Sequence, residues 1–150
     1  MGDFDFLVGS WNVANRRLIG RLAGSTEWEE FASTATCRNL FGGAANIDEF
    51  TFSDGTYGAT FRVFDPARKE WSLNWANSIN GVMEAPLFGT FSDGVGTFHG
   101  DDTFDGGPIR VRFIWSRITP TSARWEQAFS ADQEQTWETN WVMDFTRTAD

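Results

Sequence analysis

The chain has 150 residues and a formal net charge of −9, from 21 acidic and 12 basic side chains. Nucleic acids and anionic membrane surfaces attract clustered cations, so this charge predicts that neither is a partner. Eight Trp and fifteen Phe residues favour strands around a large buried core, and the length predicts one domain over residues 1–150.

The first predicted element is a short apolar segment that runs into a Gly-x-Trp motif. Residues 3–9 are suited to a helical turn, and Gly9 lets the backbone bend sharply after it. Trp11 then begins an alternating strand, in which Trp11 and Val13 share one face. We expect this face to point inward, so that Trp11 closes one end of a barrel.

Turn signals rich in Gly, Pro, Asn and Asp divide the whole chain into about ten strand-like runs. The runs are 10–19, 26–38, 45–52, 56–64, 70–76, 82–91, 95–104, 109–118, 123–130 and 135–148. Consecutive antiparallel strands lose their exposed edges when they close into a barrel. We therefore predict an all-β fold: a single closed antiparallel up-and-down β-barrel of about ten strands, with a short N-terminal helical turn.

The last predicted strand places Trp141, Met143, Phe145 and Arg147 on one face. Together with the opening Phe-Asp-Phe-x-x-Gly-x-Trp, this pattern resembles the lipocalin and fatty-acid-binding (calycin) superfamily. It is most similar to a bacterial family of lipocalin-like barrels with that opening, and it also resembles the nitrobindin group. The resemblance implies that Arg147 covers Trp11 in a cation–π contact near one end of the barrel.

Alternation along the other strands predicts which rows of side chains face the interior. The inward rows are Tyr57, Ala59, Phe61 and Val63; Trp71, Leu73 and Trp75; Ile109, Val111, Phe113 and Trp115; and Trp137, Thr139, Trp141, Met143 and Phe145. These rings predict an aromatic-walled cavity, the usual composition of a small-molecule site. The alternative is that the rings fill the barrel completely.

Four polar residues stand in phase with inward rows: Asn15 and Arg17 follow Trp11, Glu30 follows Trp28, and Gln127 precedes Phe129. A buried amide without a partner costs about 1–3 kcal/mol, so Gln127 needs a protein, water or ligand partner. Glu30 either forms an internal ion pair with Arg17 or contacts a ligand. Arg17 is also compatible with a solvated position at the rim.

These observations predict that the protein, as a monomer or homodimer, binds a small apolar or aromatic molecule inside the barrel. The predicted ligand-binding residues are Asn15, Glu30, Tyr57, Phe61, Trp75, Phe113, Trp115, Gln127 and Trp141. The alternative is a non-redox enzyme (isomerase, cyclase or hydratase) that uses an interior carboxylate as acid or base. Glu30, Asp48 and Glu49 are its candidates, and strand register decides which faces inward. A third class is a structural or partner-binding domain with a filled barrel.

Other chemistry finds little support in the sequence. Zinc sites need three or four converging ligands, whereas this chain offers one histidine, His99, and one cysteine, Cys37. Alternation places His99 on the outer face and makes Cys37 a small structural residue. Haem binding in nitrobindins relies on a histidine near the C-terminal strands, and none follows His99, so we expect no cofactor. The acidic N-terminus is unlike a signal peptide, which predicts a cytoplasmic location.

Overall fold

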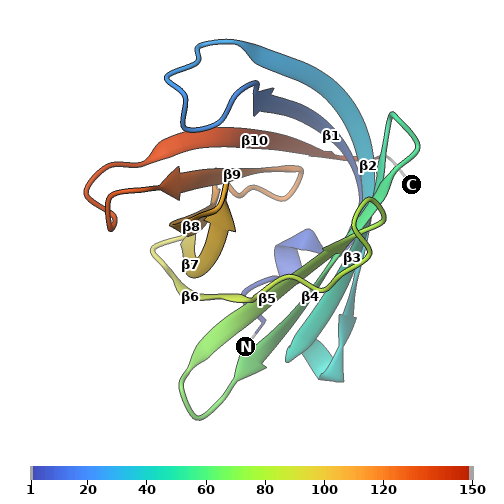
Figure 1. Ribbon diagram of the computed structural model, residues 1–150. Coiled ribbons are helices and arrows are strands. Elements are labelled where there is room, and N and C mark those ends of the chain that lie inside the picture. Colours follow the sequence, from blue (N-terminus) through green and yellow to red (C-terminus); the bar gives the residue numbers. More distant parts are fainter. Residues whose placement is uncertain (1, 149–150) are drawn as a thin grey trace.

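Alternating strands between turns containing Gly, Asn and Asp form a ten-stranded antiparallel barrel over residues 2–148, the part of the chain that the computed structural model describes (Figure 1). The strands are β1 (Gly9–Leu18), β2 (Trp28–Leu40), β3 (Ala45–Phe52), β4 (Tyr57–Asp65), β5 (Glu70–Asn77), β6 (Leu87–Ser92), β7 (Val95–Phe104), β8 (Gly107–Ser116), β9 (Ser122–Ser130) and β10 (Glu138–Arg147). Each pairs with its neighbours in the chain, and β1 also pairs with β10. The helical elements in this part of the chain are two short 3-10 turns, η1 (Asp5–Leu7) and η2 (Phe41–Gly43). The predicted fold is confirmed.

Two predicted runs are longer than the strands they contain. The run predicted at 82–91 contains β6 only from Leu87, because residues 78–86 form a loop. One isolated bridge, between Ala76 and Met83, holds that loop to β5. The run predicted at 135–148 contains β10 from Glu138, since the preceding residues belong to the β9–β10 loop. Both loops lie at the end of the barrel opposite η1.

The turn η1 lies across one end of the barrel, which we call the closed end. Phe4 and Leu7 are almost fully buried there, with exposed fractions of 1% and 2%. The Trp11 indole Nε1 donates a hydrogen bond to the Leu7 carbonyl oxygen over 2.8 Å. The apolar opening segment is therefore part of the core, because it covers rings that the strands alone would leave open to water.

Arg147 fastens this end of the barrel. Its guanidinium carbon lies 4.2 Å from the centroid of the Trp11 ring, which confirms the contact that the resemblance implies. Its two Nη atoms donate to the carbonyl oxygens of Val8 and Phe6, at 2.6 and 2.8 Å. A Cβ atom on Gly9 would lie 2.5 Å from Arg147 Nη1, at a backbone φ of +123°. Glycine is required at this position by both the close approach and the backbone conformation.

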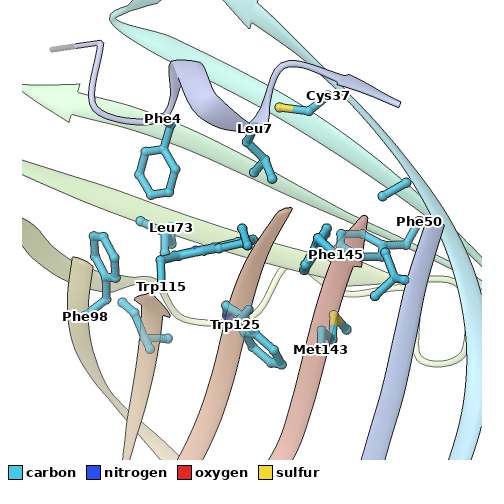
Figure 2. Packing of buried hydrophobic residues seen from close by; sticks show 14 of the residues in the cluster. Phe4, Leu7, Cys37, Phe50, Leu73, Phe98, Trp115, Trp125, Met143 and Phe145 are labelled. Carbon is cyan, nitrogen blue, oxygen red and sulfur yellow. The ribbon is translucent and has the colours of Figure 1, made fainter. Parts of the chain in front are cut away.

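The core fills the closed half of the barrel (Figure 2). Phe4 meets the Trp71 ring edge-on at 5.0 Å between centroids, and Trp115 lies 5.2 Å from Phe145. Phe98 has no exposed surface. Edge-to-face packing of this kind stabilises aromatic clusters beyond the area that they bury.

The inward row predicted for β4 is wrong. Thr60 and Arg62 are buried inside the barrel, and Phe61 and Val63 alternate with them on the outer face. The alternation of apolar residues predicts the wrong face for β4, because Arg62 lies inside the barrel, where Asp48 of β3 neutralises its charge. An ion pair of this kind allows a charged residue to occupy an interior position.

The phase predicted for β2 is also wrong. Phe31, Ser33 and Cys37 point inward, so Trp28 and Glu30 have the outward phase, and Glu30 borders the interior only at the rim of the barrel. The guanidinium of Arg16, which also faces outward, covers the Trp28 ring at 4.8 Å. Because a strand has a period of two, the inward direction assumed for Trp28 reversed the whole strand.

The row predicted for β10 is correct from Trp141 onward and wrong before it. The pairing of β10 with β9 shifts between Thr139 and Trp141, as in a β-bulge. A bulge adds one residue and reverses the phase of everything on its far side. Trp137 consequently lies outside the barrel, with its ring centroid 4.5 Å from the guanidinium carbon of Arg112 and 5.8 Å from the His99 ring.

Candidate ligand-binding site

The half of the barrel opposite η1 encloses a cavity of about 770 Å³ that opens at the mouth of the barrel. Aromatic side chains from seven strands line most of its wall. They are Phe31, Phe50, Phe52, Trp75, Phe104, Phe113, Trp115, Trp125, Phe129, Trp141 and Phe145. The volume lies within the range of roughly 300–1,000 Å³ that is usual for small-molecule sites.

The walls consist of rings that hold one another in place. Trp125 meets Trp141 edge-on at 5.5 Å and Phe113 at 5.0 Å between centroids. Phe50 stacks on Phe52 at 5.9 Å. Because the contacts of Trp125 link the neighbouring strands β8, β9 and β10, the cavity has a preformed apolar wall.

Arginine and glutamate side chains surround the mouth. Arg17 Nε lies 2.8 Å from Glu29 Oε1, and the Arg17 guanidinium carbon lies 5.1 Å from the Trp141 ring centroid. The ion pair between Arg17 and Glu30 that we considered from the sequence is therefore wrong, because Glu29 is the residue that shares a face with Arg17. The guanidinium of Arg21 lies 5.5 Å from the Phe129 ring. Burial and the neighbouring Arg17 lower the pKa of Arg21.

Acidic side chains complete the mouth on the side of β5 and β7. Glu84, Asp101 and Asp102 line it, and burial raises the pKa of the Glu84 carboxyl. Ile79, with 78% of its surface exposed, lies beside them. Sequence reasoning missed Arg21 and Glu84 because both lie in loops, where no alternation indicates which side chains turn toward the barrel axis.

The floor of the cavity carries the buried ion pair. Arg62 Nη2 lies 2.5 Å from Asp48 Oδ2, and Arg62 Nη1 donates to Asn46 Oδ1 over 3.0 Å. The other carboxylate oxygen of Asp48 accepts the Thr60 backbone N–H over 2.9 Å. Burial raises the pKa of Asp48, while Arg62 and the Thr60 N–H act in the opposite direction. Of Arg62, Asp48 and Asn46, only Arg62 lines the cavity.

Two amide side chains inside the barrel have protein partners. Asn15, with 1% of its surface exposed, accepts a hydrogen bond from Trp141 Nε1 and donates one to Ser33 Oγ, both over 3.0 Å. Asn15 therefore orients the Trp141 ring and is not itself part of the cavity wall. Gln127 does line the cavity, and its Nε2 donates to Asn140 Oδ1 over 2.8 Å. This bond supplies a protein partner for the buried amide.

The structure brings most of the predicted ligand-binding residues to one cavity. Those that line it are Glu30, Tyr57, Trp75, Phe113, Trp115, Gln127 and Trp141. Asn15 stands behind Trp141, as described above. Phe61 requires a correction, because it lies on the outer face of β4 between the inward-facing Thr60 and Arg62. The signal that would have found Arg62 is the pair of acidic and amide residues in β3, which offers it partners at matching positions.

The three candidate carboxylates occupy different environments. Asp48 is buried inside the barrel, Glu49 is exposed on the outer face, and Glu30 stands at the mouth. Both oxygens of Asp48 already accept hydrogen bonds from Arg62 and Thr60. Asp48 is thus a structural partner of Arg62, with no carboxylate oxygen directed at the cavity.

His99 and Cys37 lie apart from the cavity. His99 packs on the outer face, where its Nε2 lies 3.9 Å from Glu134 Oε1, and burial lowers its pKa. Cys37 is buried in the core, and burial raises the pKa of its thiol to about 11. Among residues 2–148, no three His, Cys, Asp or Glu side chains cluster as a metal site requires. No helix of the described chain has the length and apolar character needed to cross a membrane.

Comparison with protein-family models and with curated proteins finds no match. Comparison with solved structures finds the same fold elsewhere. The S-type phycobiliprotein lyase CPES from Guillardia theta has a TM-score of 0.63 at 15% identity, over 98% of this chain and 91% of that chain. Rv2717c from M. tuberculosis has a TM-score of 0.63 at 11% identity, over 98% of each chain. At these identities the likeness shows the fold alone, and it fits the calycin-like barrel that the opening motif predicts.

Proposed function

We propose that the protein binds a small, largely apolar or aromatic molecule inside its barrel. The observation that carries this proposal is the cavity of about 770 Å³, which is walled largely by aromatic rings and opens at the mouth of the barrel. A domain with a purely structural role would gain stability from filling this space, because empty apolar volume is destabilising. The fold comparisons are compatible with the bacterial lipocalin-like family that shares the opening motif, and we include that membership in the proposal.

Binding is better supported than acid–base catalysis. A general acid or base must reach the reacting atom of a substrate. Asp48, the buried candidate, has both oxygens engaged and does not line the cavity. Glu30 reaches the cavity only at its mouth, and Glu49 faces outward. One of the proteins that share the fold is a phycobiliprotein lyase, so the barrel itself does not decide between binding and catalysis.

A fluorescence titration with the neutral dye N-phenyl-1-naphthylamine tests the proposal. We expect one dye molecule per chain and energy transfer to it from tryptophan, since Trp75, Trp125 and Trp141 line the cavity. Val111→Trp, which extends a ring into the cavity, should weaken binding by about tenfold or more. Ile114→Trp, on the outer face of the same strand, is the matched control.

Equal dye affinity in the native protein and in a folded Val111→Trp variant would contradict the proposal. A thermal unfolding curve of each variant establishes that it is folded. If Val111→Trp does not fold, the stoichiometry in the native protein decides, because non-specific adsorption to the surface would not saturate at one dye molecule per chain.

A further inference from the structure

Two buried N–H groups at the floor of the cavity have no acceptor among the described residues 2–148. They are Arg62 Nε and Trp115 Nε1. Both side chains line the cavity, and their exposed fractions are only 3% and 2%. A buried donor without an acceptor costs about 1–3 kcal/mol, so such groups require an explanation.

The two side chains belong to one cluster. The Arg62 guanidinium carbon lies 5.7 Å from the Trp115 ring centroid and 5.0 Å from that of Phe4. Phe6 also packs against Trp115, at 5.6 Å between centroids. Phe145 packs against it at 5.2 Å (Figure 2), so the ring is held in place. The strands β4 and β8 thus place two buried donors without acceptors at the inner end of the cavity.

Charge restricts what these donors can accept. The Arg62 guanidinium is already neutralised by Asp48 at 2.5 Å, and one of its Nη atoms is used by Asn46. A ligand carboxylate brought to the same place would add a negative charge with no further cation to balance it. Burying an unbalanced charge is costly, whereas a neutral oxygen would satisfy the donors without that cost.

From these observations we infer that the ligand carries a neutral carbonyl oxygen at the end that enters the barrel first, and that Arg62 and Trp115 recognise it. This inference rests on the proposed function and narrows it to apolar or aromatic molecules with a ketone, lactone or amide group. A ligand that is a pure hydrocarbon would leave both donors unpaired, and a ligand carboxylate would be repelled by the carboxylate of Asp48.

Three probes of similar shape test the inference: fluorenone, fluorene and fluorene carboxylate. Their dissociation constants are measured at neutral pH by tryptophan quenching and by calorimetry. We expect fluorenone to bind about tenfold more tightly than fluorene, the equivalent of one buried hydrogen bond. Fluorene carboxylate should bind more weakly than fluorenone.

Two substitutions assign this preference to the floor. Trp115→Phe keeps an aromatic ring and removes the N–H, so the preference for fluorenone over fluorene should fall to about threefold or less. Trp125→Phe, in another tryptophan of the cavity wall, is the matched control and should leave the preference unchanged. Asp48→Asn removes the balancing charge, so fluorene carboxylate should gain about tenfold relative to fluorenone.

The outcomes separate the inference from the proposed function. Equal binding of fluorenone and fluorene to the native protein overturns the inference and leaves ligand binding in the barrel intact. Failure of all three probes to bind counts against the proposed function itself. A preference for fluorenone that survives in Trp115→Phe also overturns the inference. If Asp48→Asn does not fold, the comparison of Trp115→Phe with Trp125→Phe decides.

Discussion

The two ends of the barrel are built on different principles. At the closed end, Phe4, Leu7 and Trp11 are almost fully buried, and Arg147 ties the opening segment to the last strand. At the mouth, charged side chains surround an open cavity, and Ile79 is left largely exposed. Most strands reach from one end toward the other, while residues 78–86 form a loop before β6, so the difference between the ends comes from side chains and loops (Figure 1).

This contrast explains how a barrel remains folded around a cavity. A cavity forfeits packing contacts and so reduces stability. The tightly packed closed end, with its charge-assisted hydrogen bonds to backbone carbonyls, compensates for that loss. The residues at the mouth then contribute less to stability, and their side chains can determine which ligand binds. Substitutions at the closed end should therefore affect the free energy of unfolding, and those at the mouth should affect binding.

The largest effect should come from Trp11→Ala. We expect it to lower the free energy of unfolding by about 3–5 kcal/mol, because it leaves a large cavity and removes the hydrogen bond to Leu7. Urea denaturation measures the change. Trp28→Ala removes a ring of the same size from the outer face and should cost about 1 kcal/mol. Equal effects of the two substitutions would erase the distinction between the core and the surface of this barrel.

Arg147→Met should have the next largest effect. The variant loses hydrogen bonds to the carbonyl oxygens of Phe6 and Val8 and the contact over Trp11. We expect a loss of about 2–3 kcal/mol, since bonds from charged donors are strong and their acceptors are left partly buried. Arg147→Lys should recover less than half of it, because an ammonium group cannot reach two carbonyls with a planar fork. Full recovery with lysine would mean that only the charge matters.

Sequence reasoning predicted the closed end well and the interior less well. The contact of Trp11 with Arg147 follows from the opening motif and the phase of the last strand, because regular alternation runs unbroken from Trp141 to Arg147. Alternation failed wherever the chain departs from a simple period of two. The bulge after Thr139 moved Trp137 outside, and no residue type in the sequence marks that bulge.

The floor of the cavity was missed for a different reason. Assigning apolar residues to the interior places Phe61 inside and Arg62 outside, which is the reverse of what is observed. Arg62 lies inside because it forms an ion pair with Asp48 and a hydrogen bond with Asn46, both on the neighbouring strand. Pairing between strands is a tertiary property, so the preference of a single strand cannot reveal it. The polar part of a binding site is therefore the part least accessible to pattern reasoning.

At the mouth, Arg17→Met should leave stability almost unchanged. The pair of Arg17 with Glu29 is partly exposed, with 35% and 44% of the two side chains accessible, and such pairs contribute about 1 kcal/mol or less. We expect the dissociation rate of the naphthylamine dye to rise by about twofold or more, because Arg17 covers the Phe31 and Trp141 rings at the entrance. Stopped-flow fluorescence measures this rate. If Arg17→Met instead lowered the free energy of unfolding strongly and left the dissociation rate of the dye unchanged, Arg17 would have a structural role like that of the residues at the closed end.

The smallest effect concerns Asp132 in the β9–β10 loop beside the mouth. Its carboxylate accepts hydrogen bonds from the Thr136 hydroxyl and backbone N–H and from the Ser130 hydroxyl. These bonds lower its pKa from 3.8 to about 2. Because the pKa is lower in the folded state, the stabilisation is complete above pH 3.8 and is lost as the pH falls toward 2. An NMR titration of the side-chain carboxyl carbon should therefore show a midpoint near 2, and Asp132→Asn should remove the corresponding acid dependence of the loop signals. A midpoint near 4 would mean that the loop is not held by this carboxylate, and that the rim of the cavity is less ordered than its walls.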